Sequence, residues 1–227
     1  MAFGALFVND SNRIQIDETS PVLSLMDRGT ATASDPVMGS STTRAYTLTV
    51  SGRTAPLLAI GVDKPTQGEK GCHVVEAVRN GGSWTYTVII WHQYGTDFAF
   101  RWYLFDLPFG TPLTGFGKVI WDDQARIIAN SNYAPMRSVT AMAAGRVYAV
   151  VYYAPFLYEE SWYWDTTNQV DRVTWSLYAN AVATYPGATP MSGFIAGGEG
   201  FSGPTIPWPH TQTSGPLSPL FVDVTDL

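Results

Sequence analysis

Hydrophobic and polar residues alternate with a period of two along most of the chain, which is the spacing typical of β-strands. In residues 44–50, for example, Tyr46, Leu48 and Val50 alternate with smaller or polar residues, so we expect one face of this segment to be buried. No segment has the 3.6-residue period of an amphipathic helix. Further strands are predicted at residues 56–62, 72–79, 83–92, 98–105, 146–154, 170–182 and 220–224.

Turn residues between these segments favour antiparallel pairing. Asn80-Gly81-Gly82 separates two predicted strands, and an Asn-Gly pair supplies the positive φ that a tight hairpin needs. A second turn, at residues 94–97, leads into a strand whose alternate residues Phe98, Phe100 and Trp102 share one face. We therefore expect an antiparallel meander across residues 72–105.

An internal repeat relates the two halves of the chain. The window that begins at Phe3 aligns without gaps on the window that begins at Phe116, and both contain Phe-Gly, an apolar run, a polar turn and Arg-Ile. Extending the alignment places residues 20–26 opposite residues 133–139. Each copy is predicted to form a β-hairpin followed by a third strand.

Residues 185–219 have a different character, because seven prolines alternate there with glycines. Proline cannot donate to a central strand, so we expect an extended surface arm. Its last residues, 220–224, would pair with an open sheet edge in the same or a neighbouring subunit; a loosely ordered tail is the alternative. The fold prediction is an antiparallel, β-sandwich-like protein with an N-terminal module at residues 1–113, a second module at 114–184 and the arm at 185–227.

The composition excludes several kinds of partner. Charged residues make up 14% of the chain, where roughly 25% is usual, and the net charge is −6 with three lysines. Such a chain has no basic stripe for phosphates, so we expect no nucleic acid partner. The longest apolar stretch, residues 147–158, is shorter than the ~18 residues that span a bilayer, and the apolar N-terminus is too short for a signal peptide. We expect a soluble protein that folds without secretion and does not enter a membrane.

The residues that usually carry catalysis or metal binding are scarce. The sequence contains none of the phosphate-loop, nucleophile-elbow or zinc-protease motifs, and it has one cysteine and three histidines. Cys72 and His73 are adjacent, so on a strand they face opposite sides and cannot hold one zinc ion together. We expect a buried Cys72, a half-exposed His73 and a packed or hydrogen-bonded His92. No catalytic residue, metal or cofactor is predicted.

Acidic residues and aromatic rings occur together between residues 158 and 171. Glycosidases use two carboxylates across a sugar bond, and a depolymerase site here would draw on Glu159, Glu160, Asp165 and Asp171. Neighbouring acids near turns are more commonly solvated charges. We therefore expect no enzyme activity.

The aromatic residues of the same stretch form the best candidate for a recognition surface. We expect it to be a connecting loop, where rings would be exposed unless a partner covers them, and aromatic residues are favoured at interface hot spots and for stacking on sugars. The alternative is that Trp162 and Trp164 are alternate residues of another strand and pack into the core. The candidate recognition or interface residues are Tyr158, Trp162, Tyr163, Trp164, Trp208 and Phe221.

The two repeat windows also resemble a known class of protein. With Tyr133-Ala-Pro-Met-Arg137 and the terminal Leu220-Phe-Val-Asp-Val224, they are similar to small virion proteins of tailed bacteriophages. The resemblance covers about fifty residues, and it marks a fold rather than an active site. It implies a structural component of the phage particle, made in the host cytoplasm and placed at the tail tip, baseplate or fibre attachment.

The resemblance also implies partners. It implies other virion proteins and a homotrimer. A surface poor in charge and rich in Tyr, Trp and Phe also suits burial between the subunits of some symmetric oligomer. One alternative is a module that binds a host-surface glycan or receptor through the aromatic stretch. The other alternative is a capsid decoration protein.

Overall fold

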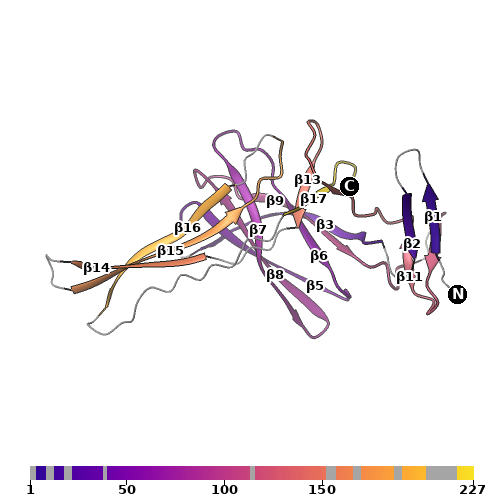
Figure 1. The fold of residues 1–227 in the computed structure, drawn as a ribbon, viewed down its shortest axis with the longest axis horizontal. Coiled ribbons are helices and arrows are strands. Elements are labelled where there is room, and N and C mark those ends of the chain that lie inside the picture. Colours follow the sequence, from indigo (N-terminus) through magenta and orange to yellow (C-terminus); the bar gives the residue numbers. More distant parts are fainter. Residues whose placement is uncertain are drawn as a thin grey trace.

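The computed structural model describes residues 4–8, 13–17, 22–37, 40–112, 116–151, 157–165, 170–186, 191–202 and 219–227. These residues form antiparallel β-sheets and contain no helix, which confirms the all-β prediction. The two larger sheets form a central body, and smaller sheets extend from it in opposite directions (Figure 1).

The larger sheet of the body has six strands drawn from the whole length of the chain. Its order is β12-β17-β13-β6-β9-β3. The bounds are β12 Ser138–Val139, β17 Leu220–Asp223, β13 Tyr148–Val151, β6 Leu57–Gly61, β9 Ala99–Asp106 and β3 Ser24–Thr32. This sheet therefore takes strands from both predicted modules and from the C-terminal residues, and the division into two modules stays a prediction.

The second sheet has four strands in the order β4-β5-β8-β7. The bounds are β4 Asp35–Pro36, β5 Thr43–Ser51, β8 Ser83–His92 and β7 Lys70–Asn80. Strands β7 and β8 form the predicted hairpin, with Asn80 paired to Ser83 and Gly81 at a φ of 60°. The predicted meander is wrong beyond β8, because β9 pairs with β3 and β6 and so belongs to the other sheet.

One hydrophobic cluster joins the two sheets. Leu58, Ile60 and Leu104 come from the six-stranded sheet, and Tyr86 and Val88 come from the four-stranded sheet. All five side chains are fully buried. The faces predicted from alternation are confirmed, since the same cluster includes Tyr46, Leu48, Val50, Phe98, Phe100, Trp102 and Leu104.

The two repeat windows form the predicted hairpins. β1 (Gly4–Val8) pairs with β2 (Arg13–Asp17), and β10 (Val119–Trp121) pairs with β11 (Ile127–Asn130). The second hairpin has a bulge between Ile120 and Trp121, so its register differs from that of the first. The segments that follow the two hairpins bond to each other, with the Leu25 N–H donating to the Ala134 carbonyl at 2.7 Å.

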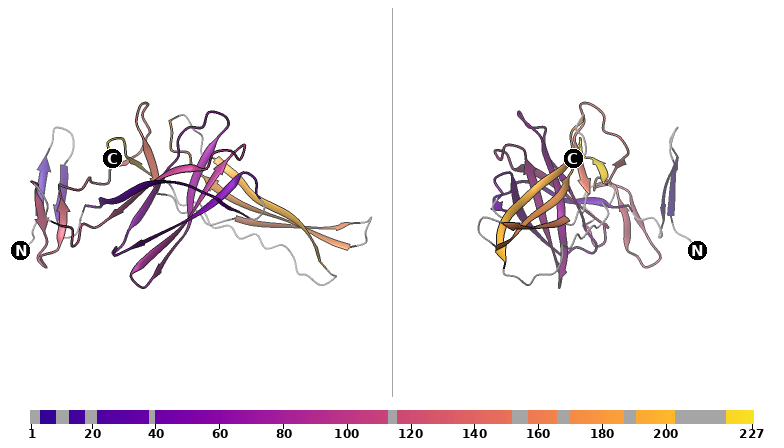
Figure 2. Two further views of the ribbon diagram at one scale, coloured as in Figure 1. Left: turned by 180° about the vertical axis from the view of Figure 1, so that it is seen from behind. Right: turned by 60° about the vertical axis from the view of Figure 1, so that its left-hand side comes forward.

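Besides the two hairpins, a three-stranded sheet extends from the body, and we call it the arm sheet. It consists of β14 (Leu157–Asp165), β15 (Val170–Ala181) and β16 (Met191–Ser202), with β15 in the centre. Figure 2 shows that it extends away from the body on the side opposite β1 and β2. The prediction for residues 185–219 missed β16, because its glycines and the flanking prolines do not resemble a strand.

The C-terminal strand lies inside its own sheet. β17 pairs with β13 on one side and with β12 on the other, so it completes this subunit's sheet and not a neighbour's. Val222 is fully buried there, in a second cluster with Tyr103 and Phe105.

Shortening Val222 tests how much β17 contributes to stability. We expect Val222→Ala to lower the free energy of unfolding by about 2 kcal/mol, because it removes two buried methyl groups and leaves a cavity. Urea unfolding followed by fluorescence measures this value. Leu220→Ala on the same strand, where the leucine is 38% exposed, should change it by less than about 0.5 kcal/mol. Equal losses in the two variants would contradict the placement of β17.

Candidate interaction arm and its attachment

The arm sheet has two long outer strands. Within the described part of the chain, β14 and β16 each pair with β15 alone, through nine and eleven residue pairs. The register places Tyr158 opposite Leu177, Trp162 opposite Val173 and Trp164 opposite Asp171. Each outer strand therefore has a backbone edge that no described strand covers.

The structure brings four of the six predicted recognition residues together on one strand. Tyr158, Trp162, Tyr163 and Trp164 all lie in β14, so the expected connecting loop is wrong, and a strand replaces it. Trp208 lies outside the described residues. Phe221 lies in β17, opposite Val150, and its half-buried ring packs against the central core.

Residues 182–185 attach the arm sheet to the body, and we call them the attachment segment. Val182 and Cys72 exchange two backbone hydrogen bonds of 3.0 Å. The Thr184 hydroxyl accepts a hydrogen bond from the Val62 N–H at 2.7 Å and donates one to the Val62 carbonyl at 2.8 Å. Because Val62 follows β6 and Cys72 lies in β7, this segment bonds to both sheets of the body.

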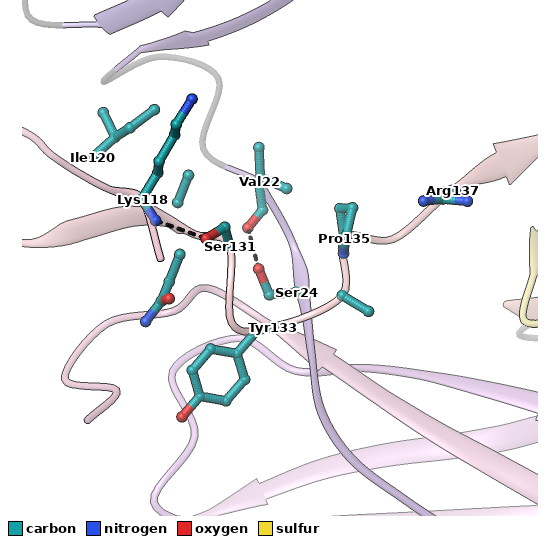
Figure 3. A pocket seen from close by; sticks show the side chains of 11 residues that line it. Val22, Ser24, Lys118, Ile120, Ser131, Tyr133, Pro135 and Arg137 are labelled. Atoms are coloured by element: carbon teal, nitrogen blue, oxygen red, sulfur yellow. Dashed lines mark hydrogen bonds between the residues drawn. The ribbon is translucent and has the colours of Figure 1, made fainter. Parts of the chain in front are cut away.

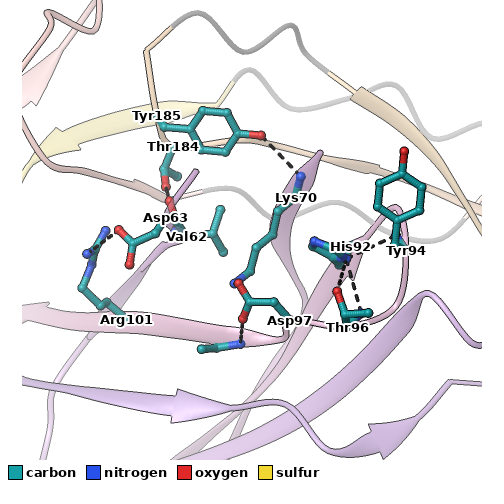
Figure 4. A network of polar contacts seen from close by, with 11 residues as sticks. Val62, Asp63, Lys70, His92, Tyr94, Thr96, Asp97, Arg101, Thr184 and Tyr185 are labelled. Atoms are coloured by element: carbon teal, nitrogen blue, oxygen red, sulfur yellow. Dashed lines mark hydrogen bonds and ion pairs between the residues drawn. The ribbon is translucent and has the colours of Figure 1, made fainter. Parts of the chain in front are cut away.

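Figure 4 shows the polar contacts around the attachment segment. The Tyr185 hydroxyl accepts a hydrogen bond from the backbone N–H of Lys70 at 3.3 Å. The Lys70 side chain is 1% exposed, and its ammonium lies 2.7 Å from the Asp97 carboxylate. A buried ammonium needs such a partner, since removing one member of the pair would leave an uncompensated charge.

Asp97 is held in its charged form. Partial burial of this carboxylate acts to raise its pKa, but hydrogen bonds from Lys70 and from the Ala99 N–H outweigh that effect and hold the pKa below its ordinary value. The Lys70–Asp97 pair borders a cavity of about 320 Å³, together with a second ion pair of 2.7 Å between Arg101 and Asp63. Each cation at this cavity thus has an acidic partner, and the arrangement favours a structural role.

The cysteine and histidines of the described residues are buried. Burial raises the pKa of the Cys72 thiol to about 12, and the thiol donates weakly to the Val182 carbonyl at 3.5 Å. His92 is 2% exposed and its Nδ1 accepts the Tyr94 N–H at 3.2 Å, which confirms the prediction for this residue. The prediction of a half-exposed His73 is wrong, because its side chain is 1% exposed and it lies opposite Ile89 of β8, which is itself buried.

Sequence reasoning did not find the attachment segment. Its hydrogen bonds to Val62 join residues 122 positions apart, and no local pattern in residues 182–185 indicates that partner. The only available signal was the β-strand pattern that ends at Val182.

No family model, curated protein or solved structure matches the chain. Among the described residues, none belongs to a helix that is long and apolar enough to cross a bilayer. The function therefore has to be inferred from the arm sheet, its attachment and the residues that they contain.

Removing the Thr184 hydroxyl tests the attachment. Thr184→Val keeps the shape of the side chain but leaves the buried N–H and carbonyl of Val62 without this partner, so we expect a loss of about 2–4 kcal/mol in unfolding free energy. Amide hydrogen exchange at Val62 should accelerate in parallel. Thr184→Ser keeps the hydroxyl and should retain most of the stability. A Thr184→Val protein as stable as the wild type would show that these bonds do not hold the arm.

His73 should make folding sensitive to acid. Burial lowers its pKa from 6.5 to about 3, so between these values the unfolded chain binds a proton that the folded chain does not. The resulting stability is complete above pH 6.5 and decreases as the pH falls towards 3, by up to about 1.4 kcal/mol per pH unit. Urea unfolding from pH 7.5 to pH 5 should show this decrease in the wild type and a smaller one in His73→Gln. A constant difference between the two proteins over that range would contradict the assignment.

Proposed function

We propose that this chain is a structural component of a bacteriophage particle that acts through protein–protein assembly. Its place would be the tail tip, the baseplate or the fibre attachment. The observation that carries the proposal is the arm sheet, which extends beyond the two-sheet body with an uncovered strand edge on each side among the described residues (Figure 1).

Long strand edges favour assembly for a physical reason. An edge strand presents a row of N–H and C=O groups that can pair with another chain. β14 and β16 have nine and twelve residues. A neighbouring strand that pairs with either edge would satisfy those groups, as in strand-addition complexes.

The composition supports the same proposal. Charged residues are depleted at the centres of subunit interfaces, whereas Trp and Tyr are enriched there. This chain is 14% charged and 14% aromatic, and β14 alone contains Tyr158, Trp162, Tyr163 and Trp164. The resemblance of the two hairpin windows to phage virion proteins supplies the biological setting, and a homotrimer or another symmetric oligomer is part of the proposal.

A second candidate function is binding of a host-surface glycan or receptor. The observation that favours it is the placement of four aromatic residues on one outer strand, because such rings can stack on sugars as well as pack against protein. The assembly function and the receptor-binding function predict different effects when these aromatic side chains are removed.

The test replaces Trp162 and Trp164 together with Ala in the phage that encodes the chain. For an assembly role we expect particles that fail to form or lack this protein, since interface tryptophans carry much of the binding energy. Electron microscopy and mass spectrometry of purified particles measure both outcomes. Tyr94→Ala, at a 57% exposed tyrosine in the turn after β8, is the matched control and should leave assembly intact.

Three outcomes would count against parts of the proposal. Complete particles that contain the variant protein but no longer adsorb to host cells would favour the receptor function. Absence of the wild-type chain from purified particles would overturn the virion role altogether, and immunogold signal over the capsid would overturn the placement in the tail.

A further inference from the structure

A cavity of about 420 Å³ lies beside the β10–β11 hairpin, where it meets the segments before β3 and before β12. Figure 3 shows the side chains around it. Val22, Ile120, Ala129 and Pro135 make much of its wall apolar, and the half-buried Tyr133 adds a ring. Its size and lining suit a large apolar or aromatic group.

Two positively charged side chains line this cavity. Lys118 and Arg137 both line it, both are exposed, and neither forms an ion pair within the described part of the chain. Arg137 also borders a smaller cavity that is lined by Asp223, Asp226 and Leu227, and Asp223 forms an ion pair with Arg146 there. In a chain of net charge −6, this is a local positive site next to an apolar hollow.

The arm sheet carries the complementary chemistry at the other end of the molecule. The sequence of β14, Leu157-Tyr-Glu-Glu-Ser-Trp-Tyr-Trp-Asp165, combines four aromatic residues with three acids. We propose that β14 of one copy binds in the Lys118–Arg137 cavity of a second copy. An aromatic ring would fill the apolar hollow, and Glu159 or Glu160 would lie near the two cations.

The positions of the two surfaces determine the kind of assembly. β10–β11 and the arm sheet extend in opposite directions from the body in Figure 1 and in the left view of Figure 2, so a copy cannot occupy its own cavity. A contact between two different surfaces is head-to-tail, and it either closes into a ring or continues as a filament. This inference rests on the proposed assembly function and identifies the partner surface as part of a second copy.

Charge reversal in the full-length protein tests the contact. The cavity variant carries Lys118→Glu and Arg137→Glu, and the arm variant carries Glu159→Lys and Glu160→Lys. Each variant alone places like charges together, so we expect its self-association to weaken by at least about tenfold relative to the wild type. Mixing the two variants restores opposite charges at both contacts and should restore co-assembly. Sedimentation velocity over a range of concentrations, with one variant fluorescently labelled, measures both effects.

Matched controls separate this contact from a general charge effect. Lys64→Glu with Arg53→Glu makes the same change of net charge at residues that do not line the cavity, and it should leave self-association unchanged. Wild-type protein that stays monomeric at all concentrations, or an oligomer that both reversals leave intact, would overturn the docking contact. Neither result would remove the chain from phage particles, so failure of this inference is distinguishable from failure of the proposed function.

Discussion

Among the described residues, one short segment, residues 182–185, attaches the arm sheet to the body by bonding to both of the body's sheets. Val182 bonds to Cys72 in the four-stranded sheet, and Thr184 bonds to Val62 at the end of β6 in the six-stranded sheet. These hydrogen bonds are buried, so their donors and acceptors could not bond to water instead if the hydrogen bonds were broken. A firm attachment is what an extended sheet needs if it is to transmit force or hold a neighbour, and the interactions proposed for β14 and β16 all depend on it.

The charged residues divide into two groups with different roles. Near the attachment, Lys70 is buried and matched by Asp97, which stabilises a fixed structure. At the cavity beside β10–β11, Lys118 and Arg137 are exposed and have no acidic partner in the described part of the chain. These two positively charged residues lie beside one apolar hollow. That contrast makes the second site the better candidate for recognition.

Local patterns predicted much of the fold, and they failed where pairing over long distances decides the outcome. Alternation located β5 to β9, and Gly81 marked the β7–β8 turn because a tight hairpin needs a positive φ. The same patterns could not show that β9 leaves β8 for the other sheet, or that a glycine-rich segment forms β16. The sequence located one part of the candidate site, the aromatic residues of β14. It could not locate the cavity beside β10–β11, because that cavity combines residues 22–24 with residues 118–137.

The sequence by itself determined an all-β chain with a hairpin at each of the two repeat windows, a shortage of charge and a group of aromatic residues near acids. These properties follow from residue type and short-range spacing, which are independent of what lies far along the chain. The tertiary structure alone decided that the C-terminal strand completes its own sheet and that the His73 side chain is buried. Which strands pair with a given strand, and which side chains cover its faces, depends on how distant parts of the chain pack against each other. Local sequence patterns do not contain that information.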